Sequence, residues 1–86
     1  MPKFDNEIHL RHQRVEEAIY KLEKYLDDAF VKGFSQVRII HGKGSGVLSQ
    51  AVRNLLKEHP LVKNFHFAEY GEGDYGVTVT EMEKRD

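Results

Sequence analysis

The spacing of apolar residues along the chain predicts two amphipathic helices. The first begins near Val15 and ends near Gly33, and apolar side chains recur along it every three to four positions, at Val15, Ala18, Ile19, Leu22, Leu26, Ala29 and Phe30. The second begins at Ser45 or Gly46 and ends at residues 58–60, because the residue before Pro60 resists helical geometry. One face of it carries Val47, Leu48, Ala51, Val52, Leu55 and Leu56.

Four shorter segments predict strands. Residues 7–11 alternate polar and apolar side chains, with Ile8 and Leu10 toward a core, and residues 37–40 form a β-branched run typical of a buried strand. Residues 61–68 predict a third strand. Residues 77–82 alternate as a fourth, with its Thr and Glu side chains facing outward.

The resulting order, β-α-β-α-β-β, predicts an α/β fold, a two-layer sandwich. A right-handed crossover makes the first two strands parallel, and the last two form a hairpin, so the four-stranded sheet is mixed. Both helices then cover one face of the sheet. With 86 residues, the chain has room for a single domain, 1–86, whose core spans about residues 7–82.

Composition narrows the class of protein. Hydrophobic residues make up 40% and charged residues 31% of the chain, and cysteine is absent, which excludes disulfides and a cysteine nucleophile. No apolar run is long enough to span a membrane, and residues 1–5 lack a signal-peptide pattern, so we expect a soluble cytoplasmic protein with no membrane partner. A net charge of −1 argues against a strongly basic nucleic-acid binder. Protonation of all five histidines would bring the charge to +4, so phosphate affinity should rise toward about pH 6.

The loop His41–Gly46 is the segment with the strongest indication of a ligand-binding or catalytic site. Glycines at alternate positions allow close approach of a ligand, and the loop opens a helix, whose N-terminus favours phosphate. Lys43 adds a cation, and His41 a group able to move protons. The alternative is a tight strand-to-helix turn with a solvated lysine. The spacing fits neither a Walker A loop nor the dinucleotide fingerprint, so nucleotide binding is disfavoured.

Residues 37–48, together with Ala51-Val52 and Leu55-Leu56, resemble the central signature of Smr (small MutS-related) domains. These domains occur at the C-terminus of the second subfamily of bacterial MutS-like proteins and as stand-alone proteins. Residues 8–12 sit where the family has Leu-Asp-Leu-His/Arg-Gly, and residues 73–79 where it has Gly-Gly-x-Gly-Val-Thr-Val. The likeness covers roughly residues 7 to 82. The family's fold, similar to the C-terminal domain of bacterial translation initiation factor three, matches the predicted order.

The resemblance implies an endonuclease that nicks DNA or cleaves RNA, with branched nucleic acid and ribosome-associated RNA as candidate substrates. It implies DNA, RNA and the ribosome as partners, and a MutS-like ATPase fused to the domain in a full-length protein. It places the functional residues in the first-strand motif and the glycine loop, which here are His9, Leu10, Arg11, His41, Gly42, Lys43 and Gly44.

The chain departs from the family pattern at several positions. The aspartate of the first motif is His9, its glycine is His12, and the threonine that caps the first helix is Arg14, a poor N-cap. Asp74 replaces a loop glycine. A carboxylate that would orient a catalytic group, activate water or hold a metal is therefore missing from the first motif.

Histidines give the sharper hypotheses. His9, His12 and His41 are expected near one another, where two imidazoles would act as acid and base in metal-free phosphodiester cleavage. A divalent metal site is a second reading. The third is that His9 is an outward strand residue and His12 a loop residue. His59 and His66 are expected at the surface.

The predicted catalytic set is therefore His41, Lys43, His9 and Arg11. The predicted nucleic-acid-binding set comprises Gly42, Gly44, Ser45, Gly46, Arg14, Arg38 and Tyr75, with Tyr70 or Tyr75 stacking on a base. Two other functions stay open. The missing aspartate favours a module that binds DNA or RNA without cutting it. The other possibility is a protein-interaction module that docks onto the ribosome or a parent ATPase.

Overall fold

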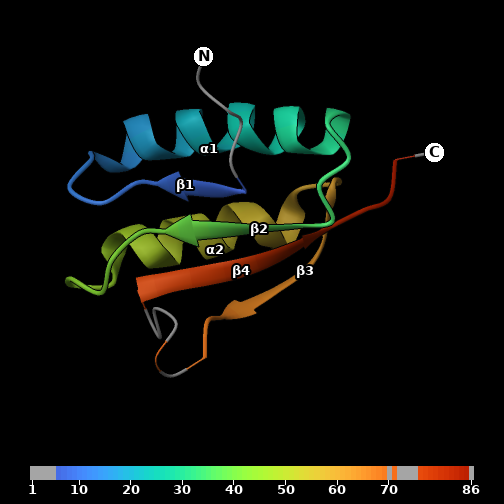
Figure 1. Ribbon diagram of the computed structural model, residues 1–86. Coiled ribbons are helices and arrows are strands. Elements are labelled where there is room, and N and C mark those ends of the chain that lie inside the picture. The colour runs from blue at the N-terminus through green and yellow to red at the C-terminus, as the bar shows by residue number, and fades with distance from the viewer. Residues whose placement is uncertain (1–5, 70, 72–75, 86) are drawn as a thin grey trace, which may run out of the picture.

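The computed structural model describes residues 6–69, 71 and 76–85. Its elements follow the predicted order: β1 (Glu7–His9), α1 (Val15–Val31), β2 (Gln36–Ile40), α2 (Val47–Glu58), β3 (Val62–Phe67) and β4 (Val77–Met82) (Figure 1). The ends differ from prediction by a few residues, as at β1, which stops at His9. Neither helix in this part of the chain has the length and apolar character needed to cross a bilayer.

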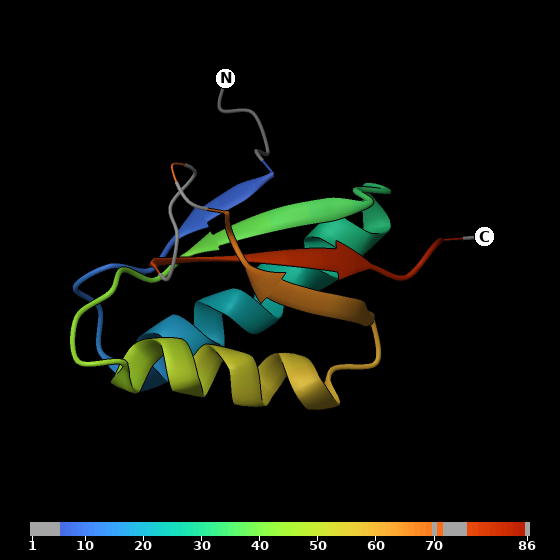
Figure 2. The same ribbon diagram turned by 90° about the horizontal axis from the view of Figure 1, so that it is seen from below.

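The sheet has four strands in the order β1-β2-β4-β3. β1 and β2 are parallel, whereas β4 is antiparallel to both β2 and β3, so the sheet is mixed as predicted. Both helices lie on the same face, which gives the expected two layers (Figure 2). Because β1 and β2 are parallel, their carboxyl ends reach the same edge of the sheet, and the segments that follow them meet there.

The core between the layers is built from the predicted apolar faces. On α1 the buried positions are Ala18, Leu22, Leu26 and Ala29, and on α2 they are Val52 and Leu56. Val47, predicted to join the apolar face of α2, is instead 62% exposed. It is the first residue of the helix.

The orientation predicted for β4 was wrong. Thr78 pairs with Ile39, and Thr80 pairs with Val37, so both threonines share the helix-covered face of the sheet with these core residues. Their exposed fractions are 1% and 0%. Alternation fixes which residues share a face, but not which face is covered. The valines of β4 join Ala68 and Ile40 in a second cluster on the other face.

Candidate functional site

The segment after β1 makes a tight turn. Leu10 is fully buried, and its N–H continues the sheet by donating to the carbonyl of Ile40 at 2.8 Å. The chain then reverses, with the Gln13 N–H donating to the Leu10 carbonyl at 3.3 Å. His12 occupies the third position of this turn at φ +66°, a left-handed conformation that favours glycine. The α1 helix that follows begins with no side-chain cap from Arg14, as predicted.

The segment after β2 is held against the start of β4. The N–H groups of His41 and Gly42 both donate to the carbonyl of Gly76, at 3.1 and 2.9 Å. Gly42 has φ +81°, and a Cβ there would lie 3.4 Å from Cγ of Arg11. A Cβ on Gly76 would likewise lie 3.4 Å from Cγ of Lys43. A Cβ at either position would make only ordinary van der Waals contact with these side chains, so the positive φ of Gly42 is what favours glycine there.

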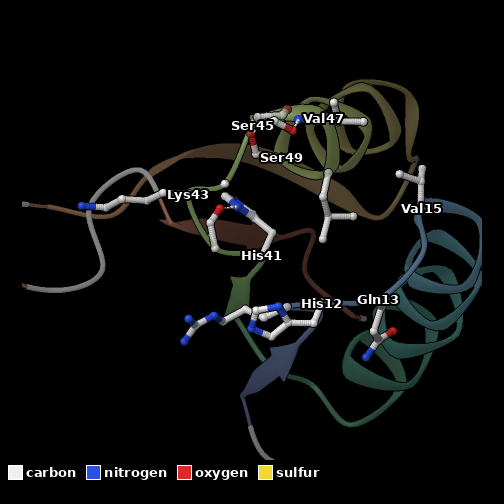
Figure 3. A pocket seen from close by; sticks show the side chains of 13 residues that line it. His12, Gln13, Val15, His41, Lys43, Ser45, Val47 and Ser49 are labelled. Atoms are coloured by element: carbon white, nitrogen blue, oxygen red, sulfur yellow. Dashed lines mark hydrogen bonds between the residues drawn. The ribbon is translucent and has the colours of Figure 1, made fainter.

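These two segments and the first turn of α2 enclose an open pocket of about 310 Å³. In Figure 3, His12 on the turn after β1 lies on one side of His41, and Ser45, Val47 and Ser49 at the start of α2 lie on the other; the Gln13 side chain points away from them. Its lining consists of Arg11, His12, Gln13, Val15 and residues 41–49. Among the described residues, no carboxylate lines this pocket, whereas two permanent cations, Arg11 and Lys43, do.

Backbone donors at the start of α2 face the same pocket. Gly46 is the N-cap at φ +88°, and Ser45 Oγ accepts from the Val47 N–H at 3.4 Å. The N–H groups of Gly44, Ser45 and Gly46 have no hydrogen-bond partner within the described ranges. Donors at a helix start, beside two cations, suit an anion such as phosphate.

His41 is the most enclosed polar residue of the pocket. Its exposed fraction is 5%. Nδ1 donates to the Gly42 carbonyl at 2.9 Å, so in the neutral ring Nε2 accepts from the Thr78 hydroxyl at 2.8 Å. The edge of the ring packs on Phe67, with 6.4 Å between centroids. Burial lowers the pKa of His41 below 6.5. The hydrogen bond to Gly42 opposes this shift, and the nearby Arg53 guanidinium adds to it. The ring is thus neutral at pH 7 and both nitrogens are occupied.

Several predicted site residues lie elsewhere. His9 does not line the pocket; it pairs with Ile40, and its Nε2 is 3.8 Å from a carboxylate oxygen of Glu7. The side chain of Arg38 is 3.4 Å from the same carboxylate. Neither Arg14 nor Arg38 lines the pocket. Tyr75, together with Tyr70 and Asp74, lies outside the described residues.

The predicted gathering of three histidines is therefore only partly realised. His12 and His41 line one pocket, and His9 does not. Among the described residues, no three His, Cys, Asp or Glu side chains are placed to hold a metal ion, so the histidines form no ligand set. His66 is exposed as predicted, but the His59 side chain is only 10% exposed, and its ring accepts from the Leu61 N–H at 3.2 Å.

Sequence reasoning missed three contributors to this site. Thr78 holds His41, Gly76 anchors the loop, and Gln13 lines the pocket and donates to the His9 carbonyl at 3.2 Å. A threonine in a central strand gave no signal of its own, because its pairing with His41 spans 37 residues of sequence. Gly76 lay within the segment that resembled the family, but only the pairing of strands shows what it contacts.

Comparison with known sequences gives a consistent result. The sequence model of the Smr domain matches residues 8–83. The chain is 55% identical over 78 residues to the Endonuclease MutS2 of Caldicellulosiruptor saccharolyticus, and 49% identical over 82 residues to that of Clostridium tetani. These alignments cover 91% and 95% of this chain but 10% of each relative. The chain therefore spans about a tenth of the length of the curated relatives it matches.

Solved structures agree with this match. The Smr domain of Thermus thermophilus MutS2 superposes with a TM-score of 0.88 at 40% identity, covering 90% of this chain and 96% of that one. YdaL, a stand-alone small MutS-related protein from Escherichia coli, also gives a TM-score of 0.88, at 26% identity, covering 96% of this chain and 67% of that one. The β-α-β-α-β-β sandwich is thus shared with domains of both kinds.

Proposed function

The chain belongs to the Smr domain family, and from that premise we propose that it is a nucleic-acid-processing domain that cuts phosphodiester bonds of DNA or RNA at the pocket between the His12 turn and the glycine loop. One observation carries the proposal. Two of the segments that carry the family likeness, separated by α1 in the sequence, line a single pocket that contains the cations Arg11 and Lys43 and no carboxylate among the described residues. The names of the MutS2 relatives supply the class of reaction.

The pocket offers a phosphate two kinds of contact. Arg11 and Lys43 supply charge, while the N–H groups of Gly44, Ser45 and Gly46 supply directed donors at the start of α2. Contacts of this kind fix the register of a nucleic-acid backbone without reading its sequence. They also stabilise the charge that builds up on phosphoryl oxygens during cleavage.

We assign His41 a positioning role rather than proton transfer. Its ring is neutral, 5% exposed, and bonded at both nitrogens to the protein itself. By holding the Gly42 carbonyl and the Thr78 hydroxyl, it fixes the first residue of the loop against β4. The backbone donors and Lys43 then start from a defined position, as preorganised stabilisation requires.

A cleavage assay on supercoiled plasmid and on a labelled structured RNA tests the proposal, with and without chelator. We expect cutting of at least one substrate by the parent domain. Lys43→Ala should reduce the rate by about 100-fold, the scale for losing one preorganised charge-stabilising group. His66→Ala, on an exposed β3 side chain outside the pocket, is the matched control and should cut like the parent. Equal rates for Lys43→Ala and the parent would contradict the assigned site.

A second function is favoured by one observation: the first-motif aspartate of the family is His9 here, and its side chain does not line the pocket. A domain without that carboxylate would bind nucleic acid at the same phosphate contacts without cutting it. Binding that weakens with salt, lost in Lys43→Ala and accompanied by no cleavage at any pH or metal, would establish this function instead.

A further inference from the structure

We infer that His12 is a further nucleic-acid-contacting residue of the pocket, whose protonated ring binds a backbone phosphate beside the one held by the glycine loop. This inference rests on the proposed function. It concerns a residue that replaces the glycine expected from the family pattern, so it is a property of this chain.

The position of His12 is the first support. Its side chain is exposed and lines the same pocket as Arg11, Lys43 and the start of α2 (Figure 3). The other imidazole of the pocket, His41, is enclosed and bonded internally. His12 therefore carries the one pocket imidazole, among the described residues, whose ring a ligand can reach directly.

The charges around His12 are the second support. Its chain neighbour Arg11 and Lys43 of the glycine loop are cations, and His41 is neutral. The remaining lining side chains, such as Gln13, Ser45 and Ser49, are uncharged. No described carboxylate lining the pocket can neutralise a protonated His12. A bound phosphate would neutralise this charge. Phosphate binding and protonation of His12 therefore favour each other, and the affinity for nucleic acid should rise as pH falls.

The backbone at His12 is the third support. Among the described residues, His12 is the sole non-glycine residue with positive φ, at +66°. Glycine would adopt this turn with less strain, so the histidine side chain is kept at a cost to stability. Strain of this kind is found where a side chain has a function beyond folding. Stability and binding should then respond to substitution in opposite directions.

The test compares the parent domain with His12→Gly and His12→Asn. The probe is a fluorescein-labelled single-stranded DNA of 20 nucleotides, its Kd measured by anisotropy between pH 6 and pH 8 at fixed salt, with thermal unfolding recorded alongside. His12→Gly should raise Tm by about 2–8 °C, because the turn loses its strain. It should weaken binding about three-fold to five-fold at pH 6, the scale of one exposed ion pair, and leave binding at pH 8 unchanged.

His12→Asn tolerates the left-handed conformation and carries no charge, so it should lose the pH dependence while folding like the parent. The control variant His66→Asn, exposed and outside the pocket, should keep the parental pH dependence. If His12→Gly and His12→Asn bind with the parent's affinity and pH dependence while Lys43→Ala loses binding, the inference fails and the proposed site stands. If the parent binds neither this probe nor the same sequence as RNA, both fail together.

Discussion

His12 and His41 line the same pocket, yet their surroundings are opposite. His41 follows a buried strand, has both ring nitrogens bonded within the protein and is 5% exposed. His12 sits on an exposed turn in a backbone conformation that disfavours its own side chain. One histidine therefore forms hydrogen bonds within the protein, whereas the other is accessible to a ligand. Surroundings, and not residue type, divide the roles in a site.

The largest expected effect comes from removing the enclosed ring. His41→Ala deletes two hydrogen bonds and leaves the buried Thr78 hydroxyl without its partner. We expect a loss of about 2–4 kcal/mol in the free energy of unfolding, measured by urea denaturation. His12→Ala removes the same ring from the other segment and is the matched control. A similar loss in both variants would erase the difference between the two histidines.

The next effect concerns the loop that His41 anchors. Gly42→Ala forces a side chain into φ +81° and places its Cβ 3.4 Å from Cγ of Arg11. We expect a loss of about 1–3 kcal/mol in unfolding free energy, because alanine is strained at this positive φ. Gly44→Ala, at φ +36° with nothing within 4 Å of the added Cβ, should cost less. Equal losses would contradict this difference.

A pH titration of stability tests the enclosed ring of His41. Burial lowers the pKa of His41 in the folded state below 6.5, so the unfolded chain binds the proton more readily. The contribution of neutral His41 is fully present above pH 6.5 and is lost as pH falls from 6.5 toward the lower folded-state pKa. The slope can approach about 1.4 kcal/mol per pH unit within that window. Urea denaturation of the parent and of His41→Gln should show the slope in the parent alone.

The smallest expected effect is on stability and comes from substitutions at His12, in the turn after β1. His12→Gly should stabilise the fold by about 0.5–1 kcal/mol, whereas His12→Ala should change it by less than about 0.5 kcal/mol, because alanine keeps the Cβ that the left-handed turn disfavours. Thermal unfolding of the pair checks this. Equal stabilisation by glycine and alanine would locate the strain in the imidazole and not in the backbone.

The sequence predicted the fold well because periodicity reports which residues share a face. The α1 stripe and the β-branched run of β2 each identified core residues that the structure buries. What periodicity left out was the side of the sheet that the helices cover, so Thr78 and Thr80 were placed outward when they are buried. Val47 was also misplaced, since the apolar stripe of α2 does not show that its first residue is left exposed.

The site was predicted less completely than the fold. Motifs located Arg11, Lys43 and the glycine loop, and parallel β1 and β2 bring them to one edge. The neighbours of each histidine depend on pairing between distant strands, which no local pattern contains. His9, His12 and His41 were expected near one another, but β1 ends at His9, and the turn that follows brings only His12 into the pocket with His41.

The placement of β4 has a consequence for how the domain is made. This strand lies between β2 and β3, although it is the last element of the chain to be synthesised (Figure 1). Until residues 77–82 emerge, β2 and β3 have no partner between them, and the carbonyl of Gly76 that anchors the loop is missing too. Folding of the sheet must therefore wait for the end of translation of this segment, with its apolar faces exposed meanwhile. The same late step completes both the four-stranded sheet and the anchor of the glycine loop, so a ribosome stalled before residue 77 would hold a chain in which neither is complete.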